Sequence, residues 1–291
     1  MISVLLATLA PPLILFLAIV WDRHQRKHTE KPPQSEKLLR PPGYSLSIRL
    51  DETFDLVIER ILIASTLSAI SSAGVIALAG LLGAHAPVSY VIMGLLAVTP
   101  FVAGCVWAAL RAFHWFKEAQ NIRLGLRGEQ AVAEALNEAS GFRVFHDMPG
   151  GDDWNIDHVA VGTQGVFLIE TKARRRRGSR NGQQAHEVIY DGEALQFPTY
   201  RAAKPIEQAK RNAKWLSNYL TKKTGEPVQV APLVVLPGWF VKISEKGNFP
   251  VWVMNATFLP GHLQRQSEQI EPAQVRRIIS AIDEKCREVE F

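Results

Sequence analysis

The sequence predicts an α/β fold, a mixed sheet flanked by helices, preceded by an all-helical region that crosses a membrane. Residues 1–114 contain three long runs free of charged side chains, whereas residues 115–291 mix charged and apolar residues as soluble globular domains do. In this second part, short alternating segments typical of strands are interleaved with longer amphipathic segments typical of helices. We therefore expect two unlike parts, of which the second folds around its own core.

Composition narrows the classes of protein to consider. The two cysteines, Cys105 and Cys286, provide neither a disulfide framework nor the spacing of a zinc site, which weakly favours a reducing compartment. The formal net charge is +5, and residues 115–291 carry 24 Lys and Arg against 21 Asp and Glu. Any binding of nucleic acid must therefore depend on local clusters of basic residues, because the bulk charge is small.

The first part is predicted to contain a membrane anchor and a helical hairpin. Residues 2–21 form an uncharged run long enough to cross a hydrocarbon core of about 30 Å. Only the α-amino group precedes this run, which predicts a retained anchor rather than a cleaved signal peptide; the alternative is a peripheral hydrophobic end. Residues 61–84 and 88–110 are the other two runs. The expected parts are an anchor (1–21), a basic loop (22–60), a transmembrane hairpin (61–114) and a soluble domain (115–291).

The charges that flank these runs predict the orientation in the membrane. Residues 22–60 carry eight Lys and Arg, residues 85–87 carry none, and Arg111 and Lys117 follow the third run. Basic loops stay in the cytoplasm. We therefore expect a multi-pass protein of the cell (inner) membrane with its soluble domain in the cytoplasm. Small residues between Ser65 and Gly74 would let helices approach closely in the lipid bilayer, so a homo-oligomer formed through these helices stays open.

The soluble part is predicted to alternate between helices and strands. A helix over residues 115–139 is expected to be interrupted at Gly125–Glu129, and a helix over 204–219 begins near Pro205. Asp191-Gly192 is typical of a tight hairpin turn. The remaining elements are strands over 142–146, 155–162, 166–172, 186–190, 194–197, 228–236 and 251–253, a loop over 147–153, and a closing helix over 272–289. This order predicts a mixed sheet with helices packed on it.

Two of the predicted strands carry charged residues on faces that are otherwise apolar. Side chains alternate along a strand, so Glu170 and Lys172 share one face, and Asp157 on the preceding strand shares its face with Val159 and Val161. Placing these charges among apolar side chains is costly unless something compensates for them. A divalent metal ion between the two carboxylates, with the lysine beside it, would compensate, and would form a phosphodiester-cleaving site.

The residue types suit Mg²⁺ or Mn²⁺, which prefer oxygen ligands and supply an activated water and charge relief in phosphodiester hydrolysis. Asp157 and Glu170 are the expected ligands, with the main-chain carbonyl of Thr171 as a third. Lys172 would orient or activate the attacking water, or stabilise the negative charge of the transition state. The alternative is an exposed hairpin with ordinary surface ion pairs.

Four segments in this order resemble one known family. They are Gly125–Glu129, Ile156–Gly162, Gly165–Lys172 and Pro205–Gln208, and the stretch from Gly125 to about Trp215 resembles the nuclease-related domain (NERD) of the PD-(D/E)XK nuclease superfamily. The resemblance implies a restriction-endonuclease-like mixed sheet and a metal-dependent nuclease core. It implies Asp157, Glu170 and Lys172 as catalytic residues. It also implies Glu129 as an accessory acid that reaches the metal from the first helix, and Gln208 as a polar residue facing the site.

A basic loop follows the predicted site. Such a loop could hold the phosphates of a bound strand, and with a basic residue on the later helix it would form a positive rim. None of these residues is expected to read bases, so we expect little sequence specificity. The alternative is a solvated, disordered loop. The candidates for nucleic-acid binding are Arg174, Arg175, Arg176, Arg177, Arg180 and Lys210.

Several other conspicuous side chains are expected to have structural roles. His158 should point to the face opposite Asp157 and be a hydrogen-bonded structural histidine, and Asp152 and Asp153 should be loop acids. Trp215, Trp239 and Trp252 are expected in the core.

The sequence thus favours a membrane-anchored, metal-dependent nuclease that acts on DNA at the cytoplasmic face. Two alternatives stay open. In the first, the same fold serves as a catalytically weak nucleic-acid-binding or docking module. In the second, the protein is a membrane sensor or assembly factor, in which the transmembrane hairpin carries the function.

Overall fold

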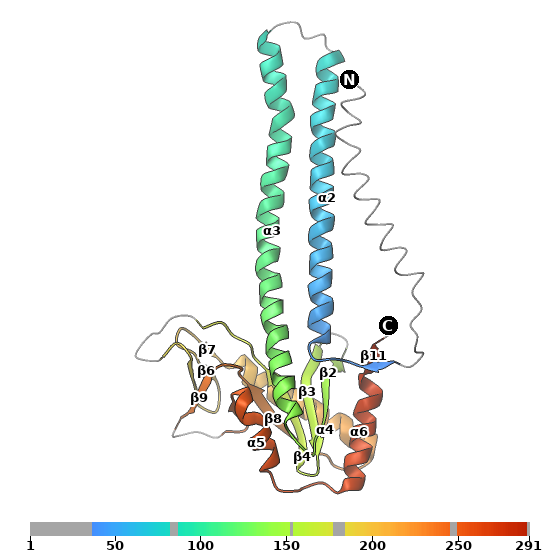
Figure 1. Cartoon of the computed structure of the whole chain (residues 1–291), viewed down its shortest axis with the longest axis vertical. Helices are drawn as coiled ribbons and strands as arrows, with labels where there is room; N and C mark the ends of the chain where they lie inside the picture. Colours follow the sequence, from blue (N-terminus) through green and yellow to red (C-terminus); the bar gives the residue numbers. More distant parts are fainter. Residues whose placement is uncertain (1–36, 82–86, 152–153, 177–183, 245–248, 290–291) are drawn as a thin grey trace. The chain divides into compact units, whose positions relative to one another are not determined.

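The computed structural model describes residues 37–81, 87–151, 154–176, 184–244 and 249–289 (Figure 1). The chain divides into two compact units. We call residues 49–121 the helical unit, and residues 34–48 together with 122–291 the sheet unit. The sheet unit is therefore assembled from two separate stretches of sequence.

The helical unit contains parts of two long helices, α2 (Tyr44–Leu81) and α3 (Pro87–Asn137). These parts lie between residues 49 and 121. The two helices lie side by side (Figure 1), and an Arg49–Glu118 ion pair at 3.0 Å and a cation–π contact of Arg60 with Trp115 join them. Residues 44–60, expected in a basic loop, thus form the first turns of α2.

No helix in the described parts of the chain has an apolar stretch long enough to cross a membrane. The transmembrane hairpin expected over residues 61–114 is thus present as a pair of helices, and its membrane-spanning character is not supported. The predicted anchor over residues 1–21 lies outside the described residues.

A five-stranded mixed sheet forms the centre of the sheet unit, in the order β10-β8-β4-β3-β2. β2, β3 and β4 are antiparallel neighbours, whereas β8 runs parallel to β4 and β10 runs parallel to β8. The predicted mixed sheet is confirmed. The strands span Arg143–Gly151 (β2), Trp154–Gly162 (β3), Gly165–Thr171 (β4), Val230–Val235 (β8) and Trp252–Met254 (β10).

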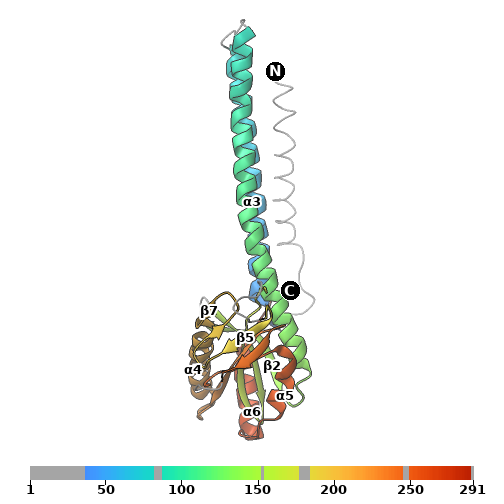
Figure 2. The ribbon, with the colours of Figure 1, turned by 90° about the vertical axis from the view of Figure 1, so that its left-hand side faces the viewer.

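Helices cover both faces of this sheet (Figure 2). On one face, α4 (Lys204–Thr224) and α6 (Pro272–Cys286) pack on a core that includes Val159, Val166 and Leu168. On the other face, the end of α3, a short η1 helix (Ala256–Phe258) and α5 (Leu259–Gln264) pack on Phe167 and Ile169. Every residue of β4 is buried as a result, because both of its faces are covered.

A second, four-stranded sheet has the order β7-β6-β5-β9. The Asp191-Gly192 turn joins β5 to β6 as predicted, and the Asp191 carboxylate accepts hydrogen bonds from the main-chain amides of Glu193 and Ala194. β9 is a strand that the sequence pattern did not indicate. The strands span Glu187–Tyr190 (β5), Leu195–Gln196 (β6), Arg201–Ala202 (β7) and Phe240–Ile243 (β9).

Two predicted boundaries differ from the structure. α3 continues through Gly125–Glu129 to Asn137, because the two glycines cost only about 1 kcal/mol each within a helix of otherwise good helix formers. The closing helix ends at Cys286, and the chain continues as β11 (Arg287–Val289), which pairs with β1 (Leu38–Leu39). This pairing holds the start of the described chain to its end.

Candidate active site

The predicted site residues meet where β3 and β4 lose their regular pairing. The last paired residues of these two strands before the site are His158 and Ile169. Beyond them a side chain replaces the main chain as acceptor: the Asp157 carboxylate accepts a hydrogen bond from the Thr171 amide at 2.7 Å. Glu170 follows Val166 and Leu168 on the face covered by α4 and is only 1% exposed. Asp157 is partly exposed and lies on the neighbouring strand.

Lys172 lies one residue beyond the end of β4. Its ammonium group donates to Oε1 of Glu170 at 2.6 Å, and its amide donates to the Val235 carbonyl at 2.9 Å. The lysine therefore has one charged partner inside the site, and its main chain is fixed by β8.

α4 supplies two amide side chains to the same carboxylate. Gln208 donates to Oε1 of Glu170 at 2.6 Å, and Asn212, one turn later, donates to Oε2 at 3.4 Å. Gln208 thus faces the site as the resemblance implied. Asn212 is almost fully buried and was not anticipated. The signal for it in the sequence is its position four residues after Gln208, between the buried Ala209 and Leu216.

Glu129 on α3 interacts with the charged groups of this cluster. Burial, and then the negative charges of Asp147 and Glu170, raise the pKa of Glu129 from 4.5 to about 7, while Lys172 and a hydrogen bond from the Gly43 amide oppose the rise. Burial and the charges of Glu170 and Glu129 likewise raise the pKa of Asp157 well above its ordinary value. The three acids are therefore close enough to feel one another's charge.

This excess of negative charge fits a divalent cation held by Asp157, Glu170 and the Thr171 carbonyl. The Oε2 atom of Glu129 is buried and has no hydrogen-bond partner in the described parts of the chain, so one oxygen in the cluster is uncommitted. Within those same parts, no three His, Cys, Asp or Glu side chains form a group that could hold a metal ion. The expected ligand set includes only two carboxylates and a main-chain oxygen, and is compatible with that finding.

Asp147 is an acid near the site that the sequence pattern placed in a loop. It lies within β2, has a positive φ of 48°, and is buried. Its carboxylate accepts from the Arg40 guanidinium at 3.1 Å and from the Ser45 hydroxyl at 2.6 Å. Both donors come from a segment more than a hundred residues earlier in the sequence.

His158 is buried and bonded to another histidine. Its Nδ1 lies 2.8 Å from Nδ1 of His146 on the neighbouring strand β2, and burial lowers the pKa of both rings, that of His146 to about 4. The pair stays neutral at physiological pH and shares one hydrogen bond, which agrees with a structural histidine.

The predicted basic rim is only partly gathered at the site. Arg174, Arg175 and Arg176 are exposed directly after Lys172, and Arg176 donates to the Gly238 carbonyl. Lys210 is also exposed. It lies two positions after Gln208 on α4, which is a rotation of about 200° around the helix axis, so the two side chains lie on opposite sides of the helix. Arg177, Arg180, Asp152 and Asp153 lie outside the described residues.

The three tryptophans differ in burial. Trp239 is buried in the core as predicted, and Trp215 is partly buried, stacked on Tyr219 with its ring centroid 5.4 Å away. Trp252 is half exposed, so its placement in the core was wrong: it lies on β10, at the edge of the five-stranded sheet. Its ring contacts His262.

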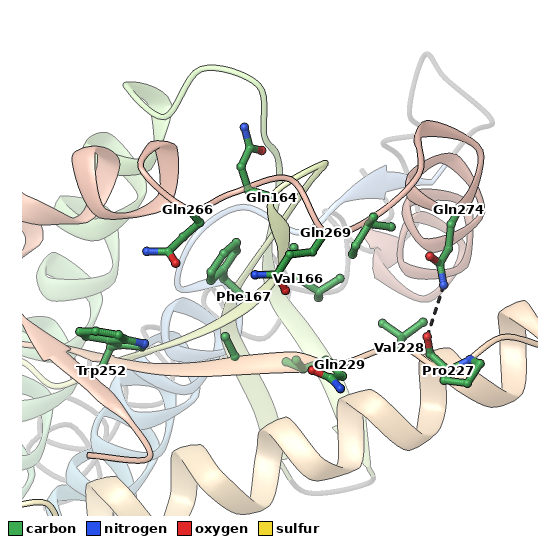
Figure 3. Close-up of a pocket in the computed structure, with 14 residues that line it drawn as sticks. Gln164, Val166, Phe167, Pro227, Val228, Gln229, Trp252, Gln266, Gln269 and Gln274 are labelled. Carbon is green, nitrogen blue, oxygen red and sulfur yellow. Dashed lines mark hydrogen bonds between the residues drawn. The ribbon is translucent and has the colours of Figure 1, made fainter. Parts of the chain in front are cut away.

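A cavity of about 540 Å³ lies at the opposite end of β4 from Glu170 (Figure 3). Val166 and Phe167 from β4 and Trp252 line it, and Gln274 closes one side through a hydrogen bond to the Pro227 carbonyl. The described residues around it are uncharged, which suits neither a metal ion nor a phosphate. Five of them are glutamines: Gln164, Gln229, Gln266, Gln269 and Gln274.

The fold and site define a mixed-sheet α/β domain with an acid–lysine cluster at the ends of two adjacent strands. Residues 124–237 match the family model of the nuclease-related domain, NERD. The match contains Glu129, Asp157, Glu170, Lys172 and Gln208, and does not contain residues 34–48. No curated protein and no solved structure matches the chain significantly.

Proposed function

We propose that this protein is a metal-dependent nuclease that hydrolyses phosphodiester bonds of DNA. The observation that carries the proposal is the convergence of Asp157, Glu170 and Lys172 at the ends of β3 and β4, within a nuclease-related domain. The match of residues 124–237 to the nuclease-related domain supports a nuclease-related function.

The roles of the residues follow from their contacts. Asp157, Glu170 and the Thr171 carbonyl would hold Mg²⁺ or Mn²⁺, which when bound supplies charge neutralisation and an activated water. Lys172, held at 2.6 Å from Glu170, would orient the attacking water or stabilise the negative charge of the transition state. Gln208 fixes the Glu170 carboxylate by occupying the same oxygen as Lys172.

The substrate is inferred from the charges after β4. Arg174, Arg175 and Arg176 extend the chain directly from Lys172 and are exposed, which suits contacts with the phosphates on either side of the scissile bond. Arg177 and Arg180 belong to the same stretch of sequence, and Lys210 would contribute less because it faces away from Gln208. Phosphate contacts carry no base information, so cleavage should depend little on sequence.

The same proposal places the helical unit in the cell (inner) membrane and the sheet unit in the cytoplasm. Residues 61–110 contain no Asp, Glu, Lys or Arg, and basic residues lie on both sides of this stretch. Large apolar side chains in it are exposed, which water would disfavour and lipid would not. They include Ile63, Leu67, Ile70, Ile92, Leu95, Val98, Val102 and Leu110.

A cleavage assay tests the nuclease proposal. The full chain in detergent is incubated with single- and double-stranded DNA and Mg²⁺ or Mn²⁺, as wild type and as Asp157→Asn, Glu170→Gln and Lys172→Ala. Each substitution should lower the rate by about 10²–10⁴, the range for a positioned acid, base or charge-stabilising group. Glu134→Gln, an exposed acid on α3, and Lys222→Ala, an exposed lysine on α4, are the matched controls.

The assay separates the proposal from its alternatives. Equal cleavage by all variants would refute the proposed site. If the purified wild type is folded but inactive with either metal, the binding module is favoured, and the affinity for DNA should then fall steeply with added salt.

A further inference from the structure

The segment before α2 contains a tight turn that presents a main-chain amide. The Tyr44 amide donates to the Pro41 carbonyl at 3.2 Å, and Gly43 has a φ of +74°. Proline second and glycine third, with a positive φ at the glycine, are the features of a type II turn. The turn's own hydrogen bond uses the Tyr44 amide, so the Gly43 amide is free to bond to the Glu129 carboxylate, which it does.

A side chain at this position would be strained. A Cβ added to Gly43 would lie 2.3 Å from Cδ1 of Leu126 and 3.7 Å from Oε2 of Glu129, on the same helix. A positive φ also disfavours any residue with a side chain. The turn therefore approaches α3 at the very residues that carry the accessory acid.

Side chains on both sides of the turn bond to Asp147. The Arg40 guanidinium donates to the Asp147 carboxylate at 3.1 Å and to its main-chain carbonyl at 3.2 Å. The Ser45 hydroxyl donates to the carboxylate at 2.6 Å and accepts from Asn155 at 2.6 Å. Asp147 is one of the charges that raise the pKa of Glu129, so these bonds also fix and partly neutralise its neighbour.

The start of the segment is fixed independently of the acids. Leu38 and Leu39 pair with β11, and the Arg40 amide donates to the Cys286 carbonyl at 3.2 Å. The segment from Leu38 to Ser45 is therefore held at one end by a strand pair and at the other by Asp147, with Gly43 between them.

We propose that residues 38–45, which we call the strap, position Glu129 for catalysis through the Gly43 amide. The amide bonds to the Glu129 carboxylate, whose Oε2 is buried without a hydrogen-bond partner in the described parts of the chain. The strap lies outside the region that matches the nuclease-related domain but belongs to the sheet unit. The catalytic part of this inference rests on the proposed nuclease function.

A double-mutant cycle tests the catalytic role. In the full chain, Gly43→Ala should lower kcat for DNA cleavage by about 10- to 100-fold, as loss of supporting contacts at metal sites does, with KM changing far less. In a Glu129→Gln background, the same substitution should have little further effect, because it acts through that carboxylate. Gly225→Ala is the matched control, since Gly225 has a φ of +76° but open space around it.

An equal loss of kcat in both backgrounds would overturn the positioning role, as would an equal loss from Gly225→Ala. Hydrogen exchange gives a readout that does not depend on cleavage. Pro41 and Pro42 have no amide hydrogen, so a peptide spanning residues 40–45 reports mainly on the amides of Gly43, Tyr44 and Ser45. Its exchange should accelerate in Glu129→Ala and not in Glu134→Ala, an exposed position on the same helix.

Unchanged exchange in Glu129→Ala would refute the contact itself. If the wild type cleaves no DNA but exchange responds as expected, the strap stands as a support of Glu129 and the proposed nuclease function fails.

Discussion

At the scale of single residues, the carboxyl group of Glu129 has an unusual environment. Its pKa is raised from 4.5 to about 7 by burial and by Asp147 and Glu170. The folded protein thus holds this proton more tightly than the unfolded chain does, so stability falls as the pH rises from about 4.5 through about 7. The change in pKa corresponds to roughly 3 kcal/mol.

Glu129→Gln should therefore stabilise the metal-free protein at high pH. In EDTA at pH 8, its Tm should exceed that of the wild type, and the difference should vanish near pH 4, where the wild-type carboxyl is protonated in both states. Thermal unfolding at the two pH values, with Glu134→Gln as control, measures this. The same difference in Tm at both pH values would contradict a buried, charge-coupled acid.

Asn212 should matter for cleavage although it touches no substrate. Asn212→Ala removes a buried donor to Oε2 of Glu170, so we expect about a 10-fold loss of kcat and a destabilisation of about 1–3 kcal/mol. Asn218→Ala on the exposed side of the same helix should change neither. Steady-state kinetics together with denaturant unfolding give both numbers, and equal kcat values for the two variants would exclude a role for Asn212.

Some residues of the candidate site could be predicted from the sequence and others could not. Asp157, Glu170 and Lys172 were found because strand alternation is local, and the resemblance added Glu129 and Gln208. Asp147, Gly43 and Arg40 could not be found in this way, because their roles depend on contacts between segments about a hundred residues apart.

At the scale of elements, α3 shows how closely a helix can approach a strand end. A Cβ at Gly128 would lie 2.5 Å from Cβ of Ala173 and 3.5 Å from Cγ2 of Thr171. The glycine thus lets the helix that carries Glu129 lie against the end of β4. The two glycines predict an interruption of the helix because their helix propensity is poor, whereas in the structure Gly128 permits close packing of the helix on the end of β4.

Gly128→Ala should destabilise the sheet unit by about 1–3 kcal/mol through overpacking, although alanine is the better helix former by about 1 kcal/mol. Gly125→Ala is the comparison, because its nearest neighbour is the end of the flexible Leu46 side chain, at 3.1 Å. Chemical denaturation should show a clearly larger loss for Gly128→Ala. A gain in stability at Gly128 would show that the helix does not pack so closely.

At the scale of the whole molecule, the uncharged stretch of the helical unit makes the membrane proposal testable. The full chain should sediment with membranes and resist alkaline carbonate, which removes peripheral proteins. Leu95→Lys should weaken this retention, because a lysine at the centre of a membrane helix costs about 2.5–3.5 kcal/mol. Phe258→Lys is a control of similar exposure in the sheet unit and should have no effect. Complete release of the wild type by carbonate would contradict membrane insertion.

The mixed sheet and most of its strands were predictable, because their hydrophobic patterns are local. The extent of the sheet unit was not. From the sequence we expected the soluble domain to begin at residue 115, whereas in the structure residues 34–48 also belong to the sheet unit. The two-residue strand β1 has no periodicity to detect, and its partner lies about 250 residues away.

The β1–β11 pair also sets an order of events during synthesis. Leu38 and Leu39 leave the ribosome early, but their partners, Arg287 to Val289, are the last described residues to be made. Until then the strap has no strand to hold it and relies on the bonds of Arg40 and Ser45 to Asp147 and of Gly43 to Glu129. During synthesis the acids and the lysine of the site are thus made before the strand pair that holds the strap, so Glu129 should gain its full support last.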